Sequence, residues 1–272
     1  MKIKAAVLWK AGEPWSVEEV DLDPPKAGEV LVRLEYAGLC HSDDHLVTGD
    51  MPALLPIVGG HEGAGVVEAV GPEVTTVAPG DHVVPMFLPA CGRCRWCAAG
   101  RSNLCDAGAE LLMGTGADGT FRVHARGQDL CTMCFLGTFS PYAVMSERSL
   151  VKIPQHFPLE VAALVSCGVT TGYGSAVHTA GVQPGETVVV VGVGGVGANA
   201  VQGARVTSRC RLDEINSGYR ICTMAATSAA SSRTSTESPH LPRLAAALIR
   251  RTAWQRSSSR RCDSRTSDRS AR

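Results

Sequence analysis

The first 36 residues alternate hydrophobic and polar positions in short runs. The runs cover residues 3–8, 17–21 and 29–36, and proline and glycine residues at 24–28 separate the last two. Alternation with a period of two places the apolar side chains on one face of a strand. The pattern therefore predicts that the chain begins as a mainly-β region, and residues 136–151 return to the same pattern.

The second half of the chain adds a helical pattern and a buried strand. Residues 159–166 have apolar positions at helical spacing, directly after Pro158. Residues 187–191 form a valine run, which predicts a buried strand, and residues 198–205 have helical character. These two elements flank a short glycine-rich segment, so the order is strand, turn and helix.

The glycine-rich segment has the G-x-G-x-x-G spacing of a dinucleotide-binding turn. This motif is weak alone, but a strand before it and a helix after it are the context that gives it meaning. The glycines permit a tight turn and a close approach of the pyrophosphate to the helix N-terminus. The candidate cofactor-binding residues are Gly192, Val193, Gly194, Gly195, Val196 and Gly197.

The pattern changes after Arg205. Residues 206–272 contain 13 Ser, 13 Arg, 7 Thr and one Gly, and they carry no second apolar strand. Asp213 and Glu214 lie near the distance at which an acid holds the cofactor ribose, but no buried strand precedes them, so we assign them no role. A short helix is predicted over 244–249, and the rest of this tail has the composition of a disordered segment.

The charge follows the same division. Residues 1–205 carry 13 basic and 21 acidic side chains, whereas residues 206–272 carry 13 basic and 5 acidic ones. A frameshift or a wrongly assigned gene end explains an arginine-rich and lysine-free tail best. The alternative is a functional tail that binds nucleic acid through its charge, but it has few aromatic side chains for stacking on bases.

Four of the eleven cysteines lie within fifteen residues, with the spacing C-x2-C-x2-C-x7-C. Four thiolates this close can surround one tetrahedral zinc ion and leave no open position, which makes a structural site. An iron–sulfur cluster also takes four thiolates, so it remains the alternative. The four candidate ligands are Cys91, Cys94, Cys97 and Cys105.

A second group of reactive side chains precedes them. Residues 38–45 hold a thiol, two imidazoles, a hydroxyl and two carboxylates, and His61 with Glu62 follows inside the glycine-rich stretch 59–71. Backbone can approach a histidine closely in such a turn, which suits a metal ligand. Cys131 and Cys134 form a further C-x-x-C pair, which we interpret as two buried thiols that shape a cleft rather than as a redox pair.

These motifs resemble those of a known family. The pattern H-E-x-x-G-x5-G-x2-V resembles the zinc signature of the medium-chain alcohol dehydrogenases, and it is formed here by His61, Glu62, Gly65, Gly71 and Val74. The resemblance covers about residues 3–205. It includes the four-cysteine lobe and Cys167, which stands before G-V-T-T-G.

The resemblance implies an α/β protein in two parts. Residues 1–168 would form a mainly-β GroES-like catalytic domain, with a structural zinc lobe at about 88–108. Residues 169–205 would begin a Rossmann domain for NAD, which is truncated by the tail 206–272. The expected cofactors are two zinc ions and NAD, although NADP is not excluded by the residues present.

The resemblance also implies a role for individual residues. Cys40, His61 and Cys167 would hold the catalytic zinc, with Asp43 orienting His61 and Glu62 behind the ion. Ser42 and His45 would pass the proton of the alcohol to solvent, and His41 would approach the cofactor pyrophosphate.

The expected reaction is oxidation of a primary alcohol to an aldehyde. The N-terminal part is similar to a bacterial branch that holds NAD tightly and uses an artificial electron acceptor. Glutathione-dependent formaldehyde dehydrogenases share the same ligands, so the substrate stays open. The alternative is an inactive zinc-binding fragment.

The N-terminal residues and the cysteines predict the cellular location. Residues 1–11 contain no long apolar run, so we expect no export signal and a cytoplasmic protein that uses its cysteines as thiols. We also expect a homo-oligomer whose interface is largely missing, and neither a membrane nor a nucleic acid as partner.

Overall fold

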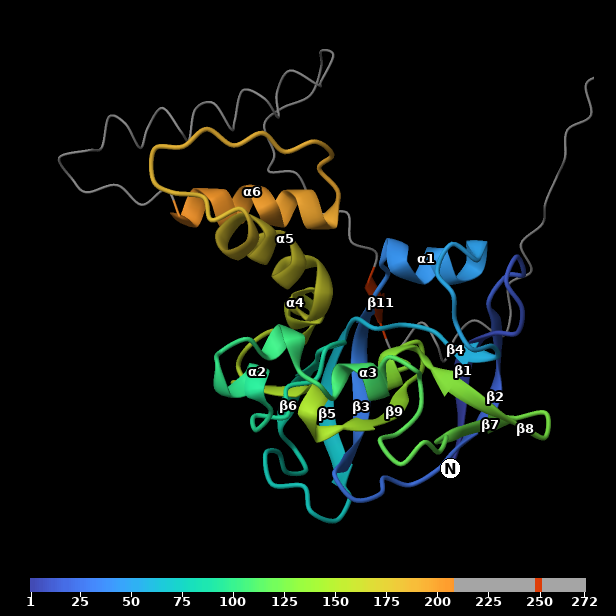
Figure 1. Cartoon of the computed structure of the whole chain (residues 1–272). Coiled ribbons are helices and arrows are strands. Elements are labelled where there is room, and N and C mark those ends of the chain that lie inside the picture. Colours follow the sequence, from blue (N-terminus) through green and yellow to red (C-terminus); the bar gives the residue numbers. More distant parts are fainter. Residues whose placement is uncertain (208–247, 251–272) are drawn as a thin grey trace, which may run out of the picture.

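The computed structural model describes residues 1–207 and 248–250 (Figure 1). The predicted β-region is confirmed, and its first part is a small closed barrel in which β4 returns to β1. Strands β1 and β2 pair antiparallel, from Lys2 opposite Asp21 to Val7 opposite Ser16. The barrel strands are β1 (Lys2–Leu8), β2 (Ser16–Leu22), β7 (Val123–Ala125), β8 (Gln128–Thr132) and β4 (Ile57–Val58).

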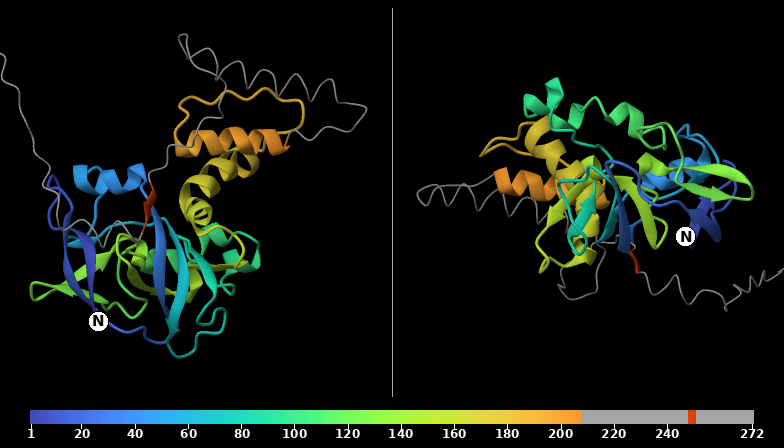
Figure 2. Two further views of the ribbon diagram at one scale, coloured as in Figure 1. Left: turned by 180° about the vertical axis from the view of Figure 1, so that it is seen from behind. Right: turned by 90° about the horizontal axis from the view of Figure 1, so that it is seen from below.

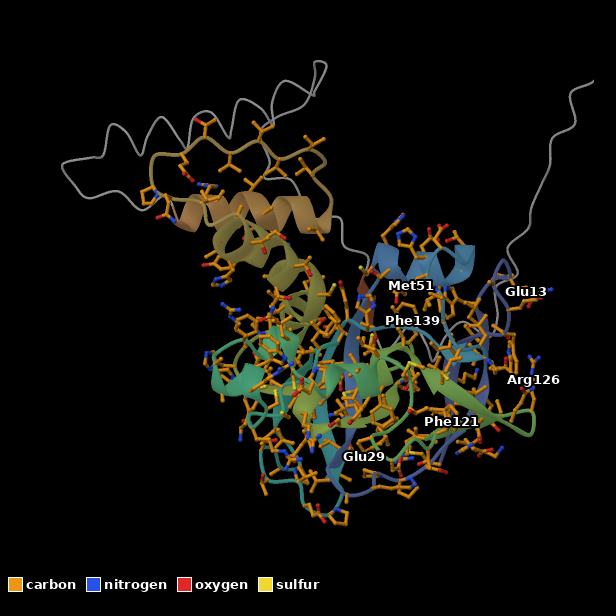
Figure 3. All side chains as sticks on the ribbon, viewed as in Figure 1. Glu13, Glu29, Met51, Phe121, Arg126 and Phe139 are labelled. Atoms are coloured by element: carbon orange, nitrogen blue, oxygen red, sulfur yellow. The ribbon has the colours of Figure 1, made fainter. Side chains whose placement is uncertain are left out.

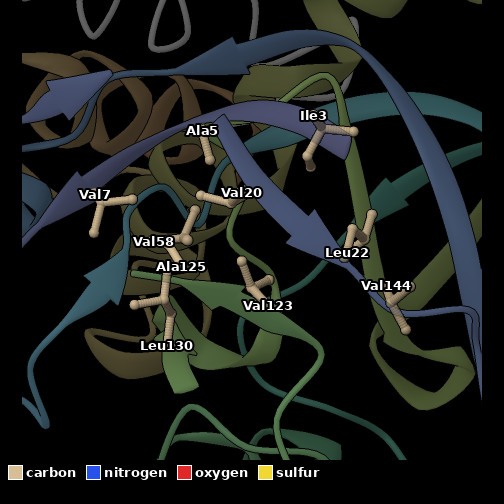
Figure 4. Packing of buried hydrophobic residues seen from close by; sticks show 10 residues of the cluster. All are labelled: Ile3, Ala5, Val7, Val20, Leu22, Val58, Val123, Ala125, Leu130 and Val144. Atoms are coloured by element: carbon tan, nitrogen blue, oxygen red, sulfur yellow. The ribbon is translucent and has the colours of Figure 1, made fainter. Parts of the chain in front are cut away.

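The barrel closes around small and branched side chains. Alternate residues of β1, namely Ile3, Ala5 and Val7, point inward and meet Val20 and Leu130 (Figure 4). All five are buried. The alternation that predicted the strands therefore also identifies the side chains of the barrel core.

A second sheet lies beside the barrel. Its central strand is β3, which pairs with β5 on one edge and buries Val30, Val32 and Leu34. On the other edge, β9 pairs with the first half of β3 and β11 with Tyr36–Gly38. The strands are β10 (Leu150–Ile153), β6 (His82–Pro85), β5 (Gly63–Val70), β3 (Glu29–Gly38), β9 (Tyr142–Ser146) and β11 (Leu248–Arg250).

The position of β11 corrects one prediction. The sequence pattern predicted a helix over 244–249, yet residues 248–250 form a strand. Because β9 begins opposite Arg33 and runs toward the start of β3, the rest of this edge of β3 is open to a further strand. Backbone pairing there outweighs the local helix preference. Asp213, Glu214 and the remainder of the tail lie outside the described residues.

A buried ion pair joins the barrel to the sheet. The Arg122 guanidinium, just before β7, donates to both carboxylate oxygens of Glu29 at 2.7 and 2.6 Å. The side chains are 1% and 7% exposed, and Glu29 begins β3 (Figure 3). Asp118 and Thr120 accept further hydrogen bonds from the same guanidinium, so the buried charge is fully paired.

Three of the six α-helices in the described residues extend together from one side of the β-region. Figures 1 and 2 show α4, α5 and α6 stacked as an arm that leaves the sheet. In this arm Gly172 of α5 lies so close to α6 that a Cβ atom there would be 2.1 Å from the Val196 carbonyl oxygen. The helices are α1 (His41–Thr48), α2 (Arg95–Ala98), α3 (Gly108–Leu111), α4 (Leu159–Leu164), α5 (Thr170–Gly174) and α6 (Gly195–Thr207).

The predicted strand at 187–191 is wrong for this structure. The segment has no regular secondary structure, and the side chains of Val189 and Val191 are 83% and 95% exposed. A strand needs a hydrogen-bonded neighbour, and within residues 1–207 no strand pairs with this segment. The predicted helix after the glycines does form, as α6. In the part of the chain described here, no helix is both long enough and apolar enough for a membrane span.

Candidate metal centres

The first centre is built on the corner between β4 and β5. Gly60 has φ +90°, a left-handed conformation that favours glycine, and it turns the chain immediately before His61. The backbone N–H groups of Thr138 and Phe139 donate to the carbonyls of Gly60 and Gly59, both at 3.0 Å. The corner is thus fixed by backbone hydrogen bonds from a neighbouring segment.

Four donor groups converge at this corner. Cys40 caps the start of α1, His61 and Glu62 follow the corner, and Cys167 lies in the π-helical turn Val165–Val169 after α4. One ligand atom from each lies within 4.8 Å of all the others. His61, Glu62 and Cys167 are buried, and the ring of Phe87 packs edge-on against the imidazole. Residues 127 positions apart in sequence therefore meet at one point.

Asp43 lies directly behind His61, as the resemblance implied. Its Oδ1 is 3.1 Å from His61 Nδ1, and its Oδ2 accepts a 2.9 Å hydrogen bond from the Cys40 backbone N–H. The contact with Asp43 places the proton on Nδ1 and leaves Nε2 as the free donor atom.

Ser166 is a supporting residue that sequence reasoning missed. Its hydroxyl donates to the Ala163 carbonyl at 2.6 Å and accepts from the Gly63 backbone N–H at 3.2 Å. It is fully buried and precedes Cys167, so it ties the cysteine turn to the start of β5. A serine in an apolar helical stretch gives no local signal of this role.

The four donor groups of the first centre have very different pKa values. Hydrogen bonds from Cys167 and His61 lower the pKa of the Cys40 thiol to about 3, and the contact with Cys40 raises the pKa of Cys167. Burial alone lowers the pKa of His61, but Asp43 and Cys40 outweigh it and raise the value to about 10. Burial and the Cys40 charge raise the pKa of Glu62 to about 7. A thiolate is therefore ready to bind, and a metal ion has to displace the protons of its partners.

The donor set fits zinc. Two cysteine sulfurs and one histidine nitrogen are the ligands of a zinc site with an open fourth position, and Glu62 supplies a carboxylate nearby. Tetrahedral zinc with bonds of about 2.0–2.3 Å needs donor atoms a little under 4 Å apart, which the clustering allows.

The second centre is the lobe after β6. The ligand atoms of Cys91, Cys94, Cys97 and Cys105 also lie within 4.8 Å of one another. Backbone N–H groups point at three of these sulfurs, from Cys94 to Cys91, from Cys97 to Cys94 and from Cys91 to Cys105, at 3.3–3.5 Å. The hydrogen bond from the Cys97 backbone lowers the pKa of the Cys94 thiol to about 6. The lobe is preformed for one tetrahedral ion.

The C-x-x-C pair is a buried part of the core. Cys131 packs beside Leu8 and Leu46, and Cys134 is partly buried against the same cluster. Burial raises the pKa of both thiols, that of Cys134 to about 12, so neither is a reactive thiolate at neutral pH. This agrees with the interpretation as structural thiols.

The predicted proton-transfer residues lie on α1. Ser42 Oγ is 3.6 Å from Cys40 Sγ, which places the hydroxyl at the edge of the first centre. His41 and His45 lie one turn apart near the surface, with ring centroids 4.8 Å apart. The structure thus groups Ser42 with the donors and leaves both histidines facing solvent.

The glycine-rich turn forms the start of α6. Gly192 has φ +86°, and a Cβ atom on Gly197 would lie 2.0 Å from the Gly192 carbonyl oxygen, so both positions require glycine. The Ala198 N–H donates to the Gly194 carbonyl at 2.9 Å. Within residues 1–207, no hydrogen bond joins this turn to the metal donors.

The chain is similar in sequence to known alcohol dehydrogenases. The alcohol dehydrogenase GroES-like domain family matches residues 26–155. Alcohol dehydrogenase B of Mycobacterium tuberculosis is 58% identical over 206 residues, which are 75% of this chain and 55% of that protein. The NDMA-dependent alcohol dehydrogenase of Amycolatopsis methanolica is 59% identical over 204 residues, again 75% and 55% of the two chains.

Solved structures give the same result. An alcohol dehydrogenase zinc-binding domain protein from Burkholderia ambifaria has a TM-score of 0.71 at 40% identity, over 76% of this chain and 56% of its own. Benzyl alcohol dehydrogenase from Acinetobacter calcoaceticus has a TM-score of 0.69 at 31% identity, with the same coverage. The chain spans about half the length of the curated relatives that it matches. Residues 26–155 therefore belong to the GroES-like domain family of alcohol dehydrogenases, and the relatives matched by the first three quarters of the chain are alcohol dehydrogenases.

Proposed function

We propose that this chain binds two zinc ions and oxidises a primary alcohol to an aldehyde, with hydride transfer to NAD. The observation that carries the proposal is the convergence of Cys40, His61 and Cys167 in a buried corner that Asp43 supports. Three protein donors leave a fourth position for a substrate oxygen. The names of the similar proteins support alcohols as the substrate class.

When bound at this corner, zinc acts as a Lewis acid that lowers the pKa of a hydroxyl group toward neutrality. The chain's own residues orient the donors and exchange protons. Asp43 holds His61 in one tautomer, and Ser166 holds the turn of Cys167 against β5. Glu62, whose pKa is raised to about 7, can exchange a proton beside the donors near neutral pH.

The proton of the alcohol needs a route to solvent. We assign its first step to the Ser42 hydroxyl, which lies beside Cys40, and its last step to His45. The His45 side chain is 44% exposed, so it can release a proton to water. A cofactor bound beside α1 would supply the hydroxyl groups needed between these two residues.

The cofactor would bind at the start of α6. The turn Gly192–Gly197 offers backbone N–H groups and the positive end of the helix dipole to a pyrophosphate. His41, exposed on α1, would approach the same phosphate groups. The four-cysteine lobe would hold the second zinc as a structural ion.

Two observations favour a second candidate, an inactive zinc-binding protein. The valines at 188–191 have no partner strand within the described residues, and the chain covers 55% of its curated relatives. Within the described residues, the cofactor site would rest on one turn and one helix, without the sheet that normally supports such a site. The zinc sites do not depend on that sheet.

Titration of the purified 272-residue protein with NAD distinguishes the two candidates. The active enzyme binds NAD and forms NADH when an alcohol is added, or reduces an artificial electron acceptor if its NAD is tightly held. His61→Ala is the matched control, because it removes a donor of the first centre and leaves the lobe intact. If the zinc-loaded protein neither contains NAD after purification nor binds it in the titration, the inactive zinc-binding protein is the remaining candidate.

We also propose a cytoplasmic location. All eight cysteines of the described residues are free thiols, and six of them are the cysteine donors of the two metal centres. Thiolate donors persist in a reducing compartment.

A further inference from the structure

Two histidines outside both cysteine centres share one face of α1. His41 and His45 are four residues apart, so one turn of the helix places them side by side. Their ring centroids are 4.8 Å apart, with the planes at 88°. His41 is exposed and the His45 side chain is 44% exposed, so an ion can reach both from solvent.

A carboxylate orients the second imidazole. Asp50, just after α1, has its Oδ2 3.4 Å from His45 Nδ1. The Thr48 hydroxyl donates to the same oxygen at 2.7 Å, which fixes the carboxylate in place. Hydrogen bonding through Nδ1 leaves His45 Nε2 with a free lone pair that is directed away from Asp50. The same carboxylate–histidine arrangement supports histidine ligands in zinc sites.

The i, i+4 spacing of His41 and His45 suits chelation of one metal ion. Histidines at i and i+4 on a helix bind one zinc ion together in the H-E-x-x-H helices of metalloproteases. Here the segment reads H-S-D-D-H, and the exposed Asp44 lies between the two imidazoles in sequence. Imidazole nitrogen favours Ni²⁺, Cu²⁺ and Zn²⁺ over Mg²⁺ or Ca²⁺. With two protein donors, water fills the remaining positions, which makes an exchangeable surface site.

We propose that His41 and His45 form a third metal site, which takes a divalent transition ion such as Zn²⁺ or Ni²⁺. The site is separate from the two cysteine centres, because it shares no donor atom with them. An ion on these imidazoles would compete with the roles proposed above for His41 and His45. Its binding is nevertheless measurable whether or not the protein oxidises alcohols.

The test is a calorimetric titration of the full-length protein with Ni²⁺, after both cysteine centres have been loaded with zinc. We expect an additional equivalent of nickel that binds without release of zinc, measured by metal analysis of the same sample. His41→Ala and His45→Ala should each abolish this equivalent. Asp50→Asn should weaken it about tenfold, because it removes the charge that orients His45.

Two other exposed histidines provide matched controls. His156 and His178 are also exposed, so His156→Ala and His178→Ala should leave the titration unchanged. The proposal is overturned if His41→Ala and His45→Ala retain the additional nickel equivalent. It is also overturned if nickel uptake is matched by an equal loss of zinc, because the cysteine centres are then the nickel sites.

Discussion

Asp43 connects two donors of the first metal centre. Its Oδ1 lies 3.1 Å from His61 Nδ1, and its Oδ2 accepts the Cys40 backbone N–H at 2.9 Å. The side chains of Asp43 and His61 are 5% and 4% exposed. Water cannot reach these groups to replace a lost hydrogen bond, so losing either contact is costly. One carboxylate thereby fixes both the tautomer of the imidazole and the start of α1.

Replacing this carboxylate tests its role. In Asp43→Asn the amide oxygen can accept from His61 or from Cys40, but its NH₂ group then faces the other donor. We expect zinc affinity at the first centre to fall about 10–100-fold, with the lobe unaffected. Chelator competition on the purified variant measures this. The matched control is Asp44→Asn, an exposed neighbour on the same helix, and an equal loss in that variant would contradict the account.

The corner before His61 allows a test of close packing. A Cβ atom at Gly60 would lie 2.5 Å from both Thr138 Oγ1 and Phe139 Cδ1, whereas at Gly12, with a similar φ of +85°, it would meet nothing within 4 Å. Gly60→Ala should therefore lower the free energy of unfolding by about 1–3 kcal/mol more than Gly12→Ala. It should also weaken zinc binding at the first centre. Urea unfolding of the two variants measures the difference, and equal effects would show that backbone strain alone acts.

The buried ion pair makes a prediction about stability. Glu29→Ala leaves the Arg122 guanidinium, which is 1% exposed, without its main partner. Breaking one side of a buried pair costs about 3–5 kcal/mol. Glu19→Ala removes an exposed partner of Lys2 and should cost at most about 1 kcal/mol. If urea unfolding gives similar values for the two variants, the pair does not hold the barrel to the sheet.

The contacts of His124 with two carboxylates predict that the stability of the protein depends on pH. His124 has Asp23 Oδ2 at 3.0 Å from Nε2 and Asp129 Oδ1 at 2.8 Å from Nδ1. Burial lowers the pKa of His124, but the two carboxylates outweigh it and raise the pKa above 6.5. The stabilisation is therefore complete below pH 6.5 and is lost as the pH rises through the higher pKa of the folded state.

The measurement compares melting temperatures of wild type and His124→Gln at pH 6 and at pH 8.5. Taking the difference between the two proteins at each pH removes the pH dependence of the metal centres. We expect the melting temperature of His124→Gln to fall further below that of wild type at pH 6 than at pH 8.5. His156→Gln, at an exposed position, serves as the control, and a deficit for His124→Gln that grows with pH would contradict the assignment.

Part of the site could be predicted because its residues carry local signals. The glycines around His61 and the spacing of Cys91 to Cys105 are visible in the sequence, and the structure brings each group together. Cys40 and Cys167 lack such a signal, and their pairing came from the family resemblance. Ser166, and the pairing of Glu29 with Arg122 across 93 positions, could not be predicted, because such contacts depend on tertiary packing.

The fold was predictable where an element contains its own hydrogen-bond partners. Helix α6 forms after the glycines because its bonds are internal. The valine run at 187–191 was predicted as a strand from side chains alone, yet a strand also needs a neighbour. The same principle explains β11, which pairs with an open stretch of β3 that no local pattern reveals.

Zinc content of the purified protein tests the central claim most directly. The two-centre account predicts two zinc ions per chain, one lost in Cys94→Ser and the other lost in His61→Ala, with both lost in the double variant. Each single variant should keep the ion of the other centre, because the two groups share no residue. The account is contradicted if both substitutions remove the same single ion.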